Sequence, residues 1–248
     1  MNLILLEPHE AVDRAAVRLD DVRARHIRDV LKATPGQSIQ IGIVDGPRGV
    51  GTVLSLDGTA VTLHCELEST PPLVPAVDLL LALPRPKVMK RLWAQLAAIG
   101  VGRILLVNAA RVERQYFDTH VLAPDCYRPL LIEGLQQARD TRLPRVSVHR
   151  RLKVLIEDEL DDLAGGSVRL LADPLARGSI AGTIEAAVAE RCLLAVGPEG
   201  GWTDFERDLF RAHSFHPVSM RARTLRSDTA CVALLTLVHE ALAPAPSA

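Results

Sequence analysis

The segment from Leu193 to Glu206 reads Leu-Leu-Ala-Val-Gly-Pro-Glu-Gly-Gly-Trp-Thr-Asp-Phe-Glu, and it decides the fold of this half of the chain. The four apolar residues at its start predict a buried strand. Pro198 ends that strand, and Gly200 and Gly201 permit a positive φ and a close approach of a ligand to the backbone. We therefore expect a sharp turn directly after a core strand.

A helix is expected directly after these glycines. Thr203 and Glu206 have the spacing of a capping box, in which each residue satisfies a backbone N–H at the start of a helix. A strand, a glycine turn and a capped helix are a common frame for a small-molecule pocket, although taken alone such a turn is more often only a connection. A phosphate site is disfavoured because no Lys-Ser/Thr pair follows the glycines.

A second segment, Met220 to Ala230, is rich in arginine and reads Met-Arg-Ala-Arg-Thr-Leu-Arg-Ser-Asp-Thr-Ala. It follows a short expected strand and leads into an apolar helix, Ala230 to Leu242. The order of strand, glycine turn, helix, strand, arginine-rich loop and closing helix resembles the end of a SPOUT-type RNA methyltransferase. The resemblance is closest to the family that methylates uridine N3 in 16S ribosomal RNA.

Two motifs carry this resemblance. The family's Gly-Pro-Glu-Gly-Gly-x-Ser/Thr-x-x-Glu motif is intact here, and its second motif reads Leu-Gly-x-Arg-Ile-Leu-Arg-x-Glu-Thr-Ala. The matching residues of the second motif are Arg223, Leu225, Arg226, Thr229 and Ala230. Arg221 stands where the family has glycine, and Asp228 stands where it has glutamate. The resemblance covers essentially the whole chain.

The fold class that the resemblance implies is α/β: an N-terminal PUA-like small β-barrel and a C-terminal SPOUT methyltransferase domain with a parallel sheet and a trefoil knot. Residues 1–70 form the barrel, 71–76 the linker and 77–248 the methyltransferase domain. The prolines between Ser69 and Pro75 oppose both helix and central strand, which suits a linker. By pattern alone, residues 1–70 fit other small barrels equally well.

The hydrophobic pattern predicts the individual elements. Strands are expected at 3–6, 15–19, 38–44, 50–56, 60–67, 77–83, 103–107, 168–172 and 192–196. Helices are expected at 87–99, 124–139 and 180–190, and at about 20–32 with Asp20 as N-cap and Val22, Ile27, Val30 and Leu31 near one face. Alternating strands and helices after residue 77 predict a mostly parallel sheet, with ligands at the carboxyl ends of its strands.

Composition excludes some classes of protein. The chain has 248 residues and a formal net charge of −1, which does not indicate a nucleic-acid binder by itself. No apolar run reaches the ~20 residues of a membrane span, and Met1 to Glu10 shows no cleavage signal, so we expect a cytoplasmic protein. The histidines show no metal-site spacing, and we expect no metal. The cysteines have no paired spacing and are expected to be buried free thiols: Cys65, Cys126, Cys192 and Cys231.

The resemblance implies that S-adenosylmethionine is the methyl donor. Backbone groups of the loops after three strands can bind adenine and ribose while side chains stay clear. The implied donor-binding residues are Leu171, Ala172, Asp173, Val196, Gly197, Pro198, Glu199, Gly200, Gly201, Met220 and Leu225.

Methylation of uridine N3 requires loss of a weakly acidic imide proton and stabilisation of the resulting anion. Arg223 and Arg226 are candidates either to stabilise that anion or to bind RNA phosphate. Alternatively, they form surface ion pairs with Asp228 or Glu199. Asp228 is a candidate proton acceptor or a residue that starts the closing helix, and Glu199 is expected to organise its own loop.

Local basic clusters can bind RNA even though the net charge is near zero, although they also fit solvated helix faces. The candidate RNA-binding residues are Arg85, Lys87, Arg139, Arg142 and Arg145. Four residues depart from the family at the expected RNA face: Gln95, Ala98, Arg139 and Asp140. These departures bear on which nucleotide is the substrate more than on the identity of the methyl donor.

The expected partners are 16S ribosomal RNA or the small ribosomal subunit, and a second copy of the chain in a homodimer, with no membrane. Two alternatives remain open at this point. One is a SPOUT methyltransferase with another RNA target, such as a ribose 2′-O, and the other is a non-catalytic RNA-binding or ribosome-assembly protein.

Overall fold

The structure is a computed structural model that describes residues 3–11, 16–220 and 225–243. The chain forms two compact units. The first comprises Met1–Val74 and Leu131–Leu143, and the second comprises Pro75–Leu130 and Pro144–Ala248. The domain boundaries expected at residues 70 and 77 stay predictions, because compactness alone does not show that a segment folds independently.

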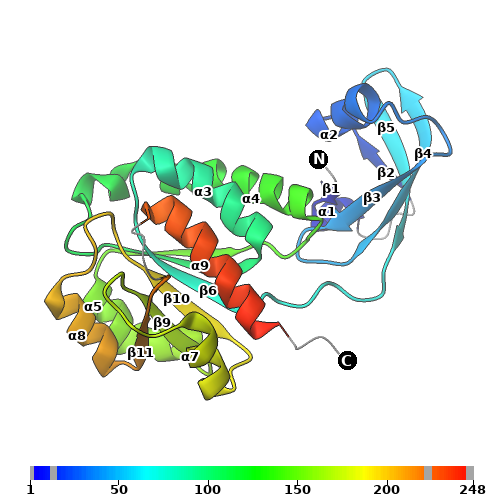
Figure 1. Cartoon of the computed structure of the whole chain (residues 1–248). Coiled ribbons are helices and arrows are strands. Elements are labelled where there is room, and N and C mark those ends of the chain that lie inside the picture. Colours follow the sequence, from blue (N-terminus) through cyan, green and yellow to red (C-terminus); the bar gives the residue numbers. More distant parts are fainter. Residues whose placement is uncertain (1–2, 12–15, 221–224, 244–248) are drawn as a thin grey trace. The chain divides into compact units, whose positions relative to one another are not determined.

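The first unit is built on a five-stranded sheet with the order β1-β3-β4-β5-β2 (Figure 1). Its strands are β1 (Ile4–Leu6), β2 (Ala16–Leu19), β3 (Ser38–Ile43), β4 (Arg48–Asp57) and β5 (Ala60–Leu67). β1 pairs with β3 in parallel, and all the other pairs are antiparallel. A register shift between Val53 and Ser55 bends β4, as a bulge does in a curled sheet. The sheet and its core match the small PUA-like barrel that the sequence analysis expected.

The helical segment of this unit departs from expectation. Besides α1 (Pro8–Ala11), it contains α2 (Val22–Arg25), which continues as a π-helical turn, η1 (His26–Val30). Asp21, and not Asp20, is the N-cap. The π turn rotates the buried face, so the residues expected on one face separate: Ile27 is buried, whereas Val22, Val30 and Leu31 are 67%, 65% and 39% exposed.

The second unit contains a six-stranded sheet with the order β11-β9-β10-β6-β7-β8, parallel at every pairing (Figure 1). Its strands are β6 (Val77–Ala82), β7 (Val101–Val107), β8 (Arg145–His149), β9 (Val168–Ala172), β10 (Cys192–Val196) and β11 (Phe215–Val218). Every residue of β6 and β10 is buried, because both strands are central and helices lie on both sides of the sheet. The parallel sheet is therefore confirmed. The expected trefoil knot stays a prediction.

The helices of the second unit connect these strands. The longer ones are α3 (Pro86–Ile99), α7 (Ile180–Ala187), α8 (Asp204–Ala212) and α9 (Ser227–Leu242). The helix α4 (Pro124–Ala138) begins in the second unit, and its residues from Leu131 onward belong to the first. The short ones are η2 (Arg114–Asp118), η3 (His120–Leu122), α5 (Leu152–Val154), η4 (Leu155–Glu159) and α6 (Leu160–Ala164). Gly100 ends α3 in the left-handed conformation, as expected. Two helix ends differ by more than one residue: α7 ends at Ala187 instead of 190, and α9 begins at Ser227 instead of Ala230.

All four cysteines are free thiols. Cys192 and Cys231 are buried, and desolvation raises the pKa of each to about 12. Cys65 and Cys126 are only half-buried, which corrects the expectation that all four lie in the core. Within the described ranges, no group of three or more potential ligands could hold a metal ion, and no helix is long and apolar enough to cross a membrane.

Candidate donor pocket at the carboxyl ends of the strands

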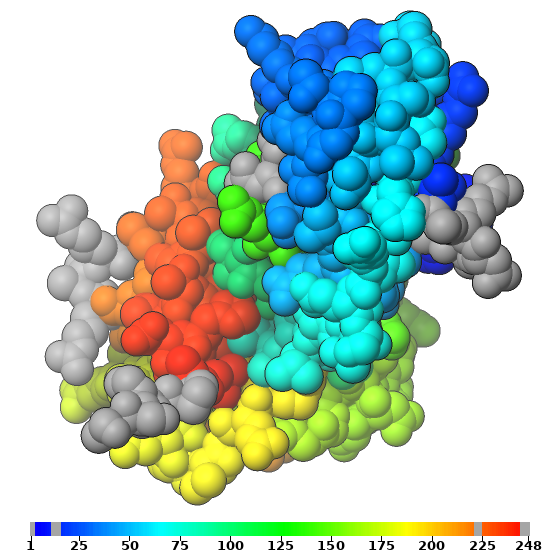
Figure 2. Space-filling model, turned by 90° about the vertical axis from the view of Figure 1, so that its right-hand side faces the viewer, coloured from blue at the N-terminus to red at the C-terminus, as the bar shows by residue number. Residues whose placement is uncertain are grey.

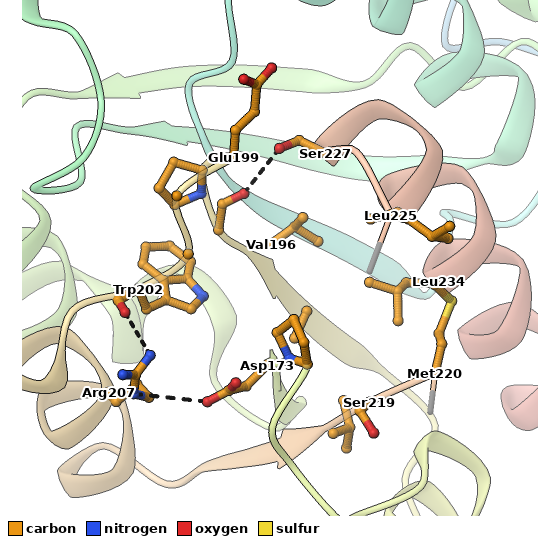
Figure 3. A pocket seen from close by; sticks show the side chains of 18 residues that line it. Asp173, Val196, Glu199, Trp202, Arg207, Ser219, Met220, Leu225, Ser227 and Leu234 are labelled. Carbon is orange, nitrogen blue, oxygen red and sulfur yellow. Dashed lines mark hydrogen bonds and ion pairs between the residues drawn. The ribbon is translucent and has the colours of Figure 1, made fainter. Parts of the chain in front are cut away.

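A cavity of about 240 Å³ lies where β9, β10 and β11 end (Figure 3). These three strands are neighbours and run in parallel, so the loops that follow them meet at one edge of the sheet. Ten of the eleven expected donor-binding residues line the cavity: Ala172, Asp173, Val196, Gly197, Pro198, Glu199, Gly200, Gly201, Met220 and Leu225. The exception is Leu171, which is fully buried within β9.

The glycines of this turn serve different purposes. Gly201 has a positive φ of 72°, and its N–H donates to the carbonyl of Pro198 at 2.8 Å, which closes the turn. Gly200 has no positive φ, so the close approach of a ligand is the remaining expected reason for glycine there. An added Cβ at Gly197 would lie 3.0 Å from Cε2 and Nε1 of the buried Trp202 ring. The turn therefore needs glycine at Gly201 for its φ and at Gly197 for space.

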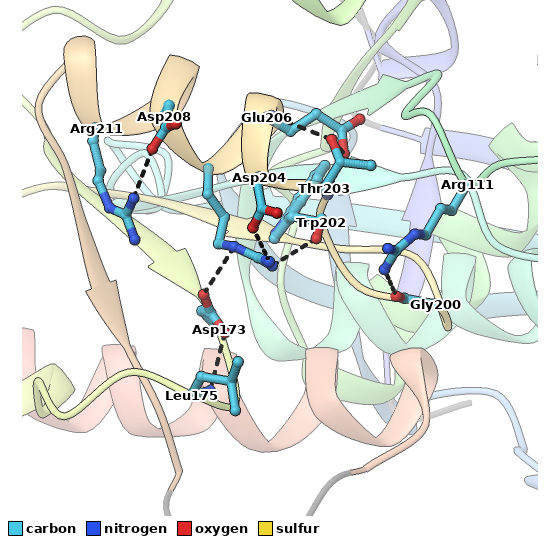
Figure 4. A network of polar contacts seen from close by, with 11 residues as sticks. Arg111, Asp173, Leu175, Gly200, Trp202, Thr203, Asp204, Glu206, Asp208 and Arg211 are labelled. Atoms are coloured by element: carbon cyan, nitrogen blue, oxygen red, sulfur yellow. Dashed lines mark hydrogen bonds and ion pairs between the residues drawn. The ribbon is translucent and has the colours of Figure 1, made fainter.

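A buried carboxylate ties this turn to the rest of the site (Figure 4). The capping box is confirmed: the backbone N–H and hydroxyl of Thr203 donate to Glu206 Oε2 at 2.8 and 2.9 Å. The other oxygen, Oε1, accepts the backbone N–H of Ala110 at 2.7 Å, and only 4% of Glu206 is exposed. Arg111 also donates to the carbonyl of Gly200. The segment after β7 thus holds the glycine turn in place.

The two ends of the cavity differ in polarity (Figure 3). Leu225, Leu234 and Met220 lie at one end, and Arg207 and Asp173 lie at the other. Arg207 Nε and Asp173 Oδ2 are 3.9 Å apart, which makes an ion pair but not a hydrogen bond. The contacts of Arg207 also raise its pKa, with the hydrogen bond to Asp204 as the main cause. Sequence reasoning missed Arg207, and only its position one residue after the family motif could have drawn attention to it.

The candidate catalytic residues lie at the start of α9. Arg226 is the exposed N-cap residue, and Asp228 is in the first turn. Arg221 and Arg223 lie outside the described residues. Asp228 Oδ2 pairs with Arg91 Nη2 at 3.1 Å.

Glu199 Oε2 similarly pairs with Arg85 Nη2 at 3.4 Å. Glu199 and Asp228 were considered as partners for Arg223 and Arg226. Glu199 pairs with Arg85, just before α3, and Asp228 pairs with Arg91 within α3. The sequence placed Arg91 in a basic cluster with Arg85, Lys87 and Lys90, but it was not among the candidate site residues.

The candidate RNA-binding residues belong to both compact units. In the second unit, Arg85, Lys87 and Arg145 are exposed, and Arg145 begins the edge strand β8. In the first unit, Arg139 is exposed with a φ of 58° just after α4. Arg142 is half-buried and donates to the carbonyls of Pro72 at 2.6 Å and Asp45 at 3.3 Å, so it stabilises its own unit.

Comparisons with known proteins agree with this architecture. A family model described as an RNA methyltransferase domain matches residues 71–239. Ribosomal RNA small subunit methyltransferase E from Treponema pallidum is 31% identical over 242 residues, which is 96% of this chain and 90% of that protein. Ribosomal RNA small subunit methyltransferase E 1 from Borreliella burgdorferi is 25% identical and covers 94% of this chain and 95% of its own length.

Among solved structures, ribosomal RNA small subunit methyltransferase E from Neisseria gonorrhoeae, bound to S-adenosyl methionine, has a TM-score of 0.77. It is 19% identical and covers 97% of each chain, so it shows a shared fold. These findings define an RNA methyltransferase. The chain belongs to the family of ribosomal RNA small subunit methyltransferase E, as its two motifs indicated.

Proposed function

We propose that this protein transfers a methyl group from S-adenosylmethionine to N3 of a uridine in 16S ribosomal RNA. The observation that carries the proposal is the cavity at the ends of β9, β10 and β11, built from the glycine turn that the family motif predicts and bordered by the start of α9. A methyl donor held there lies beside Met220, Leu225 and the start of α9.

The residues of the cavity fit S-adenosylmethionine. Apolar side chains such as Val196, Leu225 and Leu234 suit the faces of an adenine, and backbone groups of the glycine turn are available to the ribose. The carboxylates of Asp173 and Glu199 give the lining negative charge, which suits a donor with positive sulfonium and ammonium groups. The sulfonium supplies an electrophilic methyl group. By this reasoning the residues expected from the resemblance, apart from the buried Leu171, are the donor site.

The protein's own contribution to catalysis is positioning and charge. Loss of the N3 proton leaves a negative charge on the uracil O2 and O4, and a guanidinium can donate to either oxygen. We assign this role to Arg226, which is exposed at the start of α9, and extend it to Arg223 by resemblance. The ion pair of Asp228 with Arg91 links the start of α9 to α3, so a role for Asp228 as proton acceptor is a separate hypothesis.

We further propose that the active form is a cytoplasmic homodimer. The helix α9 is apolar on more than one side, and Figure 2 shows it (red) at the surface beside the yellow segment that contains α7. Leu237 on α9 is 45% exposed. Exposed arginines and Lys87 of both units then contact RNA phosphates of the 16S rRNA or the small subunit.

The test of substrate is nucleoside mass mapping of 16S rRNA from a deletion strain. We expect the loss of one N3-methyluridine, restored by the wild-type gene. Loss of a ribose 2′-O-methyl group instead would identify a different target, and an unchanged set of modifications would indicate a non-catalytic protein.

Arg226→Ala tests the proposed catalytic role. Removing a charged donor from a developing oxyanion should slow single-turnover methylation about a hundredfold at saturating RNA and donor. Arg145→Ala is the control: if Arg145 only contacts phosphate, it should weaken RNA binding and reach the wild-type rate once RNA is saturating. A wild-type rate for Arg226→Ala under the same conditions would make Arg226 a phosphate contact.

A further inference from the structure

Arg207 reaches the donor pocket in a fixed orientation. It lies in the first turn of α8, and its Nη1 donates to the carbonyl of Trp202 at 2.6 Å while Nη2 donates to Asp204 Oδ1 at 2.8 Å. These two bonds hold the guanidinium so that Nε faces Asp173, as Figure 3 shows. The cation is therefore positioned before any ligand binds, which limits the entropy lost on binding.

Asp173 is held equally firmly on the opposite side. Its backbone N–H donates to the carbonyl of Val218 at 3.0 Å, and its Oδ1 accepts the N–H of Leu175 at 3.0 Å. Only 7% of the residue is exposed. Its other oxygen, Oδ2, has the 3.9 Å ion pair to Arg207 as its contact among the described residues.

The ion pair between Arg207 and Asp173 is unusual if its role is only to stabilise the fold. A buried carboxylate is costly unless its charge is both paired and hydrogen-bonded, and here the cation lies beyond hydrogen-bond distance. Both groups line the cavity, at the end opposite Leu225 and Leu234. An opposite pair of charges, fixed but not in direct hydrogen-bonded contact, is complementary to a ligand that itself carries both charges.

We propose that Arg207 and Asp173 form the subsite for the zwitterionic amino-acid end of the methyl donor. The α-carboxylate is bound by Arg207, and the α-ammonium is bound by Asp173 Oδ2. The adenine is then directed to the apolar end of the cavity. This inference rests on the proposed use of S-adenosylmethionine, and it adds the residues that orient the donor.

The test compares two ligands that differ in the amino-acid part. S-adenosylhomocysteine carries the complete zwitterion, whereas 5′-methylthioadenosine keeps the adenine, ribose and sulfur but lacks both charges. Calorimetry is carried out with the full-length wild-type protein, with Arg207→Met, and with Asp173→Asn. Arg211→Met is the matched control, because Arg211 lies one turn further along α8 and pairs with Asp208 at 2.8 Å outside the cavity.

We expect Arg207→Met to weaken S-adenosylhomocysteine about 10- to 100-fold, the usual range for losing a charged hydrogen bond, and to leave 5′-methylthioadenosine unchanged. Asp173→Asn should show the same selectivity, and Arg211→Met should bind both ligands like the wild type. An unchanged affinity of Arg207→Met for S-adenosylhomocysteine would overturn the proposal.

Other outcomes are equally decisive. Equal losses for both ligands in Arg207→Met would mean that Arg207 supports the fold of the loop and not the amino-acid end. Equal losses in Asp173→Asn would place the ribose diol at Asp173 and overturn the subsite. A wild-type protein that binds neither ligand would overturn the proposed donor itself, so failure of the subsite and failure of the function are distinguishable.

Discussion

Gly197 lies so close to an aromatic ring that an added side chain would require the ring to shift by a few tenths of an ångström. An added Cβ would lie 3.0 Å from the indole of Trp202, which is 2% exposed and packs edge-on against Phe210. The ring cannot move aside without disturbing this cluster, because protein interiors have little free space. The first glycine of the motif is thus required by packing beneath the pocket.

Gly197→Ala should therefore destabilise the protein by about 1–3 kcal/mol, the usual cost of overpacking, and should weaken binding of S-adenosylhomocysteine. Urea denaturation and calorimetry measure the two effects. Gly200→Ala is the matched control for stability alone, because Gly200 itself lines the donor pocket. Its Cβ would meet Cδ of the exposed Arg111 side chain at 3.0 Å, and a flexible side chain can move away. Comparable losses of stability in Gly197→Ala and Gly200→Ala would refute the packing argument.

At the start of α8, Glu206 both caps the helix and contacts a second segment of the chain. Glu206 satisfies the N–H and hydroxyl of Thr203 and, through its other oxygen, the N–H of Ala110 after β7. One carboxylate thus joins the glycine turn after β10 to the segment after β7, across the intervening strand β6. The helix cap uses Glu206 Oε2, whereas the contact with Ala110, the tether to the segment after β7, uses Oε1. The loss of the cap and the loss of the tether can therefore be separated.

Glu206→Ala leaves buried donors without an acceptor and should lower the free energy of unfolding by about 3 kcal/mol. Glu206→Gln keeps one acceptor oxygen and should lose less. Asp208→Ala, an exposed carboxylate on the same helix, should change stability by less than about 0.5 kcal/mol. Urea denaturation gives all three values, and a Glu206→Ala variant as stable as Asp208→Ala would rule out the tether.

At the scale of the whole molecule, the proposed homodimer depends on α9. Leu237 is 45% exposed on this helix, whereas Leu234, Leu235 and Val238 are buried within the unit. Exposed apolar residues at a helix face often mark an interface. The same helix begins at the candidate catalytic residues, so pairing through α9 would place two pockets near one interface.

Leu237→Lys should therefore convert the dimer to a monomer, as measured by light scattering at micromolar concentration. Thr236→Lys adds the same charge at the neighbouring exposed position and should leave the dimer intact. A wild-type protein that is monomeric at this concentration, or a dimer that survives Leu237→Lys, would contradict an interface centred on this residue.

Local sequence was enough to predict the strands, turns and helix starts that depend on residues close together in the chain. Apolar runs and the glycines after them located the strands of the parallel sheet, and the spacing of Thr203 and Glu206 located the start of α8. The resemblance that the two motifs carry identified the family and ten of the residues that line the cavity. Local pattern failed at α2, where a π turn changed which residues face the core.

Which side chains from distant parts of the sequence meet in the site could be seen from the tertiary structure alone. Glu206 contacts Ala110 across 96 positions of the chain, and Arg207 faces Asp173 because β9 and β10 are adjacent in the sheet. Arg85 engages Glu199 because β6 and β10 are adjacent, and Arg91 engages Asp228 because α3 packs against α9. Such pairs depend on the order and register of parallel strands, which long-range packing sets and which no local pattern of residues encodes.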